Sequence, residues 1–84
     1  MQINLLPGQF LALEEKLSVQ QGIIITETGT NSGTIANSDV TLSYVYDGDS
    51  VLDVEIIAKH SWKAKIANDN QINQHIRDLI IKAI

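Results

Sequence analysis

Apolar residues near the start of the chain recur at helical spacing. Four of them lie four, three and four positions apart and therefore share one face of a helix: Leu6, Phe10, Leu13 and Leu17. Pro7 suits the first turn, where its missing N–H has no intrahelical role, and Gly22 is a typical residue at a helix end. The pattern predicts an N-terminal amphipathic helix.

The middle of the chain has a two-residue period instead. Apolar side chains alternate with others over residues 40–46 and again over residues 52–58, as expected for strands that bury one face. The two apolar faces coincide if 46 pairs with 52, 44 with 54, 42 with 56 and 40 with 58, because a one-residue slip would invert a strand. This register predicts a hairpin loop of about three or five residues, with a left-handed residue at or near Gly48 or Asp49.

The alternation continues through the stretch KHSWKAKI, residues 59–66. It predicts that the last strand extends to Ile66, bent by a bulge near residues 37–39, with Trp62 on the inner face. The three lysines of the stretch then lie on the outer face, where Asp39 is the cross-strand partner of Lys59. The alternative is a helix that begins at Ser61.

The remaining patterns complete an α+β fold. Residues 23–26 are typical of a strand, a turn follows at residues 29–32, and a second strand resumes near Thr34 and Ile35. A closing helix is predicted after an N-cap at Asn68 or Asp69, with an apolar stripe made of Ile72, Ile76, Leu79, Ile80 and Ala83. We expect one domain over residues 1–84, in which a three- to four-stranded antiparallel sheet carries both helices on one face.

Charge and composition exclude several classes of function. The net charge of −4 disfavours a general nucleic-acid binder or a protein that binds an anionic membrane surface. The chain has no cysteine, no run of 18 apolar residues and no basic segment at its N-terminus. These features favour a cytoplasmic protein that binds neither nucleic acid nor membrane.

No sequence motif indicates a cofactor or a metal. The chain lacks a P-loop and a dinucleotide-binding glycine motif. Asp47, Asp49 and Asp53 do not follow the spacing of a calcium loop, and a zinc site would need more ligands than His60 and His75. We therefore expect no cofactor, no metal and no catalytic residues.

The favoured hypothesis is a small non-enzymatic module for protein interaction or structure. Its partner-binding residues would be Lys59, Lys63 and Lys65, and its partner would be another protein or a second copy in a homodimer. A homodimer is considered because Val45 and Ile57 are expected on the outer sheet face, and the strand with three isoleucines would also expose an apolar side chain. The alternative is a binder of an apolar small molecule between sheet and helices. That site would be lined by Phe10, Tyr44, Tyr46 and Trp62. A less favoured alternative is an enzyme that uses His60 or His75.

Overall fold

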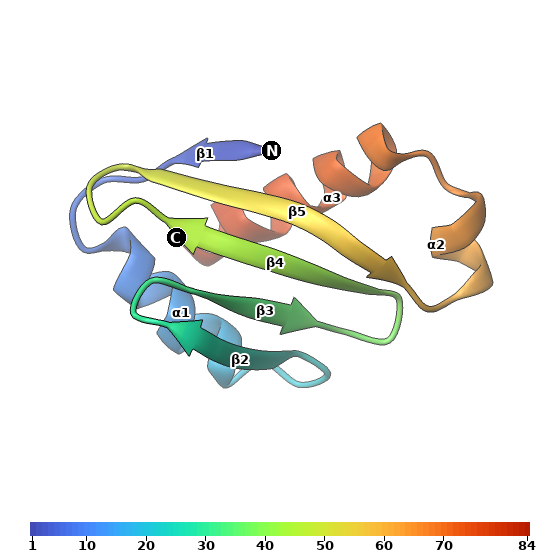
Figure 1. The fold of residues 1–84 in the computed structure, drawn as a ribbon, viewed down its shortest axis with the longest axis horizontal. Helices are drawn as coiled ribbons and strands as arrows, with labels where there is room; N and C mark the ends of the chain where they lie inside the picture. Colours follow the sequence, from blue (N-terminus) through green and yellow to red (C-terminus); the bar gives the residue numbers. More distant parts are fainter.

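A five-stranded antiparallel sheet forms one layer of the protein, and three helices form the other (Figure 1). The structure is a computed structural model and describes residues 1–84. The strands are β1 Gln2–Asn4, β2 Ile24–Gly29, β3 Ser32–Ala36, β4 Val40–Tyr46 and β5 Val51–Lys59, in the sheet order β1-β5-β4-β3-β2. The helices are α1 Gln9–Ser18, α2 Trp62–Ile66 and α3 Asp69–Ala83. The α+β class is confirmed, whereas the expected number of strands and helices was too small.

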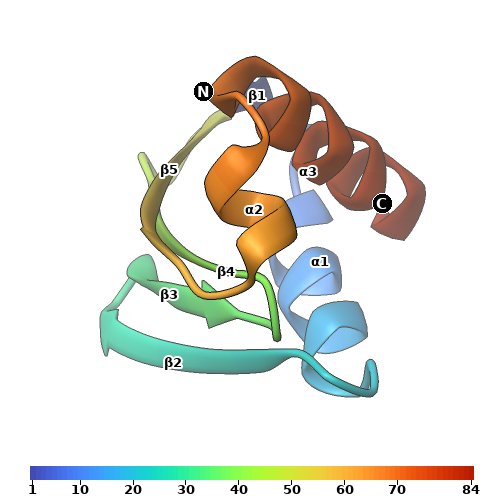
Figure 2. The same ribbon diagram turned by 90° about the vertical axis from the view of Figure 1, so that its right-hand side faces the viewer.

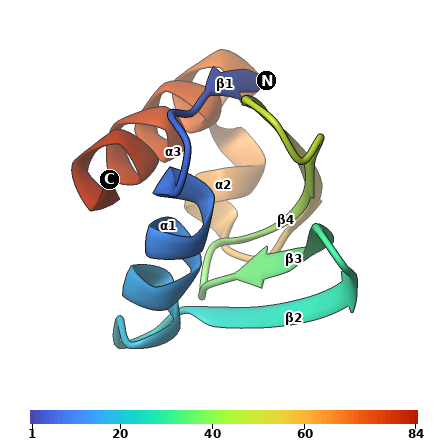
Figure 3. The same cartoon turned by 90° about the vertical axis from the view of Figure 1, so that its left-hand side faces the viewer.

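The sheet curves around the helices, which all lie on the same side of it (Figures 2 and 3). The predicted placement of the N- and C-terminal helices on one sheet face is therefore confirmed. Thirteen buried apolar side chains form a single core between the two layers. Leu52 and Val54 of β5 are its most deeply buried large side chains, at 1% and 2% exposure.

Strand β1 was not predicted from the sequence. It lies at the edge of the sheet, where Ile3 pairs with Leu52 of β5. The N-terminal ammonium group donates a hydrogen bond of 2.9 Å to the carbonyl of Val54 and lies 3.8 Å from a carboxylate oxygen of Asp53. The pairing buries Ile3 and covers the first part of the outer edge of β5, residues 51–53, which would otherwise be open to another strand.

Helix α1 begins later than the spacing of its apolar residues indicates. Phe10, Leu13 and Leu17 are buried as expected, but Leu6 is 67% exposed and Leu5 takes its place in the core. Gly8 has a φ of +85° and precedes the first helical residue. Because this left-handed residue redirects the chain, Leu6 falls outside the helix.

The predicted hairpin register is correct over most of its length. Residues 46, 44 and 42 pair with 52, 54 and 56, but Val40 pairs with Lys59 rather than with Ala58. The pairing shifts between Thr41 and Leu42, which leaves Ile57 of β5 as an extra residue. The bulge therefore lies in β5, not near residues 37–39, and the expected pair of Asp39 with Lys59 does not form.

The hairpin loop also agrees with the expectation. Gly48 has a φ of +87°, and the Asp47 carboxylate accepts hydrogen bonds from the backbone N–H groups of Asp49, Ser50 and Val51 at 2.8–3.0 Å. These bonds lower the pKa of Asp47, with the bond from Asp49 contributing most. By accepting these hydrogen bonds, the Asp47 side chain stabilises the turn and determines where β5 begins.

The prediction that β5 extends to Ile66 is wrong, and the alternative of a helix from Ser61 is correct. The strand ends at Lys59, and the Ser61 hydroxyl accepts a 3.1 Å hydrogen bond from the N–H of Ala64 as the N-cap of α2. Trp62, expected in the core, is 68% exposed. The cause is the length of β4: beyond Val40 there is no strand residue to pair with β5, so the backbone of the stretch forms its own hydrogen bonds in a helix.

Candidate functional site

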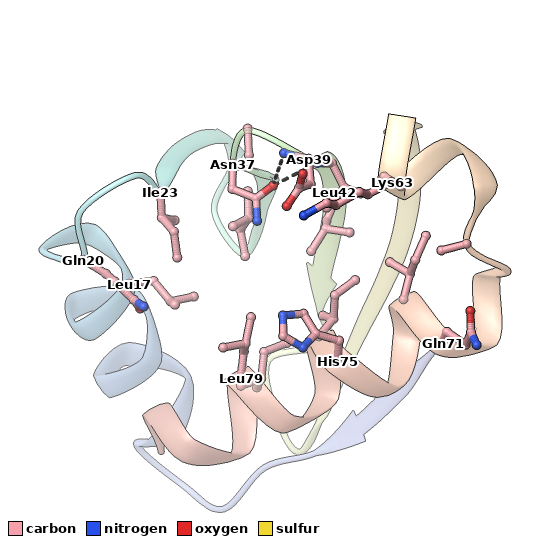
Figure 4. Close-up of a pocket in the computed structure, with 18 residues that line it drawn as sticks. Leu17, Gln20, Ile23, Asn37, Asp39, Leu42, Lys63, Gln71, His75 and Leu79 are labelled. Carbon is pink, nitrogen blue, oxygen red and sulfur yellow. Dashed lines mark hydrogen bonds between the residues drawn. The ribbon is translucent and has the colours of Figure 1, made fainter. Parts of the chain in front are cut away.

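A groove of about 290 Å³ lies between the helical layer and one end of the sheet (Figure 4). The core side chains do not fill this space. Its apolar lining comes from both layers: Leu17, Ile23, Ile35, Ala36, Val40, Leu42, Ala64, Ala67, Ile72, Ile76, Leu79 and Ile80. The volume lies at the lower end of the range of small-molecule sites, and the mainly apolar lining is typical of them.

Small side chains leave this space open. Ala36 at the end of β3, Ala64 on α2 and Ala67 after α2 all line the groove, and the side chain of each is only a methyl group. Larger residues at these positions would close the gap between the layers, because protein interiors otherwise pack to near crystal density. Leu79, part of the predicted apolar stripe of α3, is 38% exposed because its side chain borders the groove.

Six polar side chains complete the lining of the groove: Gln20, Asn37, Asp39, Lys63, Gln71 and His75. Asn37 is fixed, because its side-chain oxygen accepts 2.8 Å hydrogen bonds from the N–H groups of Asp39 and Val40. Figure 4 shows the His75 imidazole projecting from α3 toward the groove. The site thus combines a mainly apolar wall with groups that can donate or accept hydrogen bonds.

Three of the four aromatic residues in the alternative ligand site, Phe10, Tyr44 and Tyr46, pack together in or against the core instead. Phe10 stacks on Tyr46, with ring centroids 4.3 Å apart and planes 11° from parallel, and it lies tilted against Tyr44 at 6.1 Å. The structure therefore brings these three residues together, but none of them lines the groove. Trp62 is separate from this cluster and lies on the exposed side of α2.

Tyr44 carries a polar atom that the core does not satisfy. The side chain is 3% exposed and its hydroxyl has no hydrogen-bond partner. Burial raises the pKa of Tyr44, and the negative charges of Glu14 and Glu27 raise it further. The hydroxyl therefore stays protonated at neutral pH.

The three lysines do not form the single stripe that was expected on the outer sheet face. Lys59 ends β5, and its ammonium group lies 2.6 Å from a carboxylate oxygen of Asp69. Lys63 and Lys65 lie on α2, exposed and without an ion pair. Lys63 also lines the groove.

The two histidines lie in different surroundings. The His60 Nε2 is 2.6 Å from the Thr41 hydroxyl oxygen, whereas His75 lines the groove. The structure contains no group of three His, Cys, Asp or Glu side chains placed to hold a metal ion. Neither ring is hydrogen-bonded to a carboxylate that would orient it as a general base.

Sequence reasoning missed most of the groove. His75 was considered as a catalytic candidate, but nothing in its helical position indicated that it would border a cavity. The apolar lining residues from α1, β4 and α3 were assigned correctly to the inner faces, yet such a pattern does not tell a filled core from an unfilled one. The one available signal, for helix α2, was Ser61 followed by WKAKI, because serine is a preferred N-cap and Ala and Lys favour helix over strand.

Comparison with known proteins finds no matching family model, no matching curated protein and no matching solved structure. No helix of the structure combines the length and the apolar character needed to cross a bilayer.

Proposed function

We propose that the protein is a non-enzymatic binding module that holds an apolar small molecule in the groove. The observation that carries this proposal is an unfilled space of about 290 Å³ with twelve hydrophobic residues among its 18 lining residues. Water in such a space would find few hydrogen-bond partners along most of the wall. An apolar ligand in this space would remove its own apolar surface and that of the groove from water, which favours binding.

The lining defines the chemistry of the ligand. The ligand is mainly apolar, and one polar group of it can reach the edge of the groove where Asn37 and Asp39 lie next to each other. Lys63 and Asp39 place opposite charges at the same groove, so a neutral hydrogen-bonding group, such as a hydroxyl or an amide, fits this edge better than a strongly charged one. The absence of an orienting carboxylate beside His75 favours binding over catalysis.

A titration with the neutral fluorescent probe N-phenyl-1-naphthylamine tests the proposal, because its emission rises in an apolar site. We expect saturable binding to the unaltered protein and a loss of about tenfold in affinity for Leu79→Lys, which places a charge in the groove. The matched control is Ile81→Lys on the same helix. Ile81 is 52% exposed and does not line the groove, so this variant should bind the probe normally.

Amide chemical shifts locate the bound probe. We expect the largest changes at groove residues such as Ala36, Ala67 and Leu79. Intrinsic fluorescence of Trp62 is a poor reporter, because that side chain lies outside the groove. Absence of saturable binding, or equal affinity for both lysine variants, would contradict the proposal.

A further inference from the structure

Helix α2 presents an apolar pair to solvent between two lysines. At about 100° per residue, Trp62 and Ile66 lie about 40° apart, with Lys65 about 60° to one side of Trp62 and Lys63 about 100° to the other. Ala64 falls on the opposite side, and it is the one buried residue of the helix. The five residues of α2 therefore divide into one that packs on the core and four that are exposed, of which Lys63 also lines the groove.

The apolar pair is unusually exposed. Trp62 is 68% exposed and Ile66 is 74% exposed. Neither side chain belongs to the hydrophobic core or packs against it. Tryptophan is the residue type most enriched among the side chains that dominate binding energy at protein interfaces, because a single side chain buries a large area.

The surroundings of α2 are basic although the whole protein is acidic. Residues 59–65 hold three of the chain's six Lys and Arg residues. Two of its ten Asp and Glu residues lie close by: Asp69 is bound to Lys59, and the carbonyl of Asp39 accepts the N–H of His60. Lys63 and Lys65 form no ion pair within the chain, although Asp39 lines the same groove as Lys63, so both ammonium groups can meet an incoming acidic group.

We propose that the outward face of α2, formed by Trp62, Lys63, Lys65 and Ile66, is a docking surface for an acidic segment of a partner protein. The partner supplies an apolar side chain that covers Trp62 and Ile66, and carboxylates that meet the two lysines. This surface is separate from the apolar part of the groove and does not depend on a ligand there. Of the three lysines expected to bind a partner, this surface includes Lys63 and Lys65, and it adds Trp62. Lys59 is not part of it, because its ammonium group is paired with the Asp69 carboxylate.

An anionic lipid surface is the other ligand that tryptophan and lysine side chains can bind. The observations favour the protein segment. The net charge of −4 opposes the approach of the protein to an anionic bilayer. A short acidic peptide segment, by contrast, contacts only the basic surface at α2 and not the acidic remainder of the protein. Two lysines also provide little attraction to a bilayer, because stable electrostatic binding to anionic lipid takes a larger cluster of basic residues.

Selection from a phage-displayed library of random short peptides tests the proposal. We expect the selected peptides to be rich in Asp and Glu and to contain an aromatic or aliphatic side chain. Because Trp62 is the only tryptophan, a shift of the emission to shorter wavelength on addition of the free peptide places that peptide at α2. We expect Trp62→Ala to weaken binding about 30-fold, as for an interface hot spot.

Charge reversals give the second test. The double variant Lys63→Glu and Lys65→Glu should bind the peptide at least about tenfold more weakly, and salt should weaken binding to the unaltered protein. The matched control reverses Lys16 and Lys82, which are exposed on α1 and α3, and should retain binding. Selected peptides without acidic residues, or equal binding by both double variants, would overturn the proposal. Tighter binding to phosphatidylglycerol vesicles than to the peptides would overturn it in favour of a lipid surface.

Discussion

Glu14 is the carboxyl group whose charge is most clearly penalised by its surroundings. Burial raises its pKa above the ordinary value of 4.5, and the charge of Glu27 and a hydrogen bond between the two side chains raise it further. The folded protein therefore holds a proton at Glu14 at pH values where the unfolded chain has lost it. The contribution of this group to the free energy of unfolding falls as the pH rises from about 4.5 through the raised pKa.

We predict that Glu14→Gln stabilises the protein at pH 7. The amide removes the buried charge and its repulsion with Glu27, a gain of about 0.5 kcal/mol after allowance for solvent screening. The gain should disappear at low pH, where Glu14 is protonated in both states. Urea unfolding at pH 7 and at pH 4 measures both effects, with Glu15→Gln on the exposed side of α1 as the control. A gain that is the same at both pH values would contradict the assigned cause.

At the scale of elements, strands β2, β3 and β4 meet at Gly33. This residue pairs with Glu27 of β2 on one side and with Tyr44 of β4 on the other. A Cβ atom at position 33 would collide with the backbone carbonyl of Thr26 and would come within 2.9 Å of the Tyr44 hydroxyl. Only a residue without a side chain fits between the two neighbouring strands here.

We predict that Gly33→Ala destabilises the protein by about 3 kcal/mol, because backbone atoms cannot give way as flexible side chains do. Gly29→Ala is the matched control in the adjacent strand. A Cβ atom there meets mainly the end of the Ser32 side chain, which can rotate. Thermal unfolding of the two variants gives the comparison, and equal losses of stability would show that the close approach at Gly33 does not matter.

At the scale of the whole molecule, the groove leaves the core smaller than it could be. Fourteen of 84 residues are buried, and an unfilled space adjoins the core residues Leu17, Leu42 and Ile76. A ligand that binds only the folded state stabilises it by mass action. The stability of the protein should therefore depend on ligand occupancy.

We predict that N-phenyl-1-naphthylamine at a hundredfold excess over its Kd raises the free energy of unfolding by about 2.7 kcal/mol. For a domain of this size, this corresponds to an increase of roughly 10–20 °C in Tm. The same probe concentration should raise the Tm of Leu79→Lys by several degrees less. A scanning calorimetry series with both proteins measures the difference, and an equal increase in the two would place the probe outside the groove.

Elements with local signals could be predicted from the amino-acid sequence. The helical spacing of Phe10, Leu13 and Leu17 and the alternation of β4 and β5 gave the correct faces, because periodicity depends on backbone geometry alone. Asp47 and Gly48 gave the hairpin turn, and Asn68 gave the start of α3, where its side-chain oxygen accepts the N–H of Gln71 at 2.9 Å. Each of these features depends on residues within a few positions of one another.

Three features depend on contacts between distant parts of the chain: the end of β5, the addition of β1 to the sheet and the groove between the layers. An alternating pattern continues to Ile66, but a strand needs a neighbour to receive its hydrogen bonds, and the pairing with β4 stops at Lys59. Three residues of β1 show no period of their own and gain partners only from β5. The groove depends on the distance between the sheet and the helices. That distance is set by the packing of all the core side chains together, so no local sequence pattern predicts it.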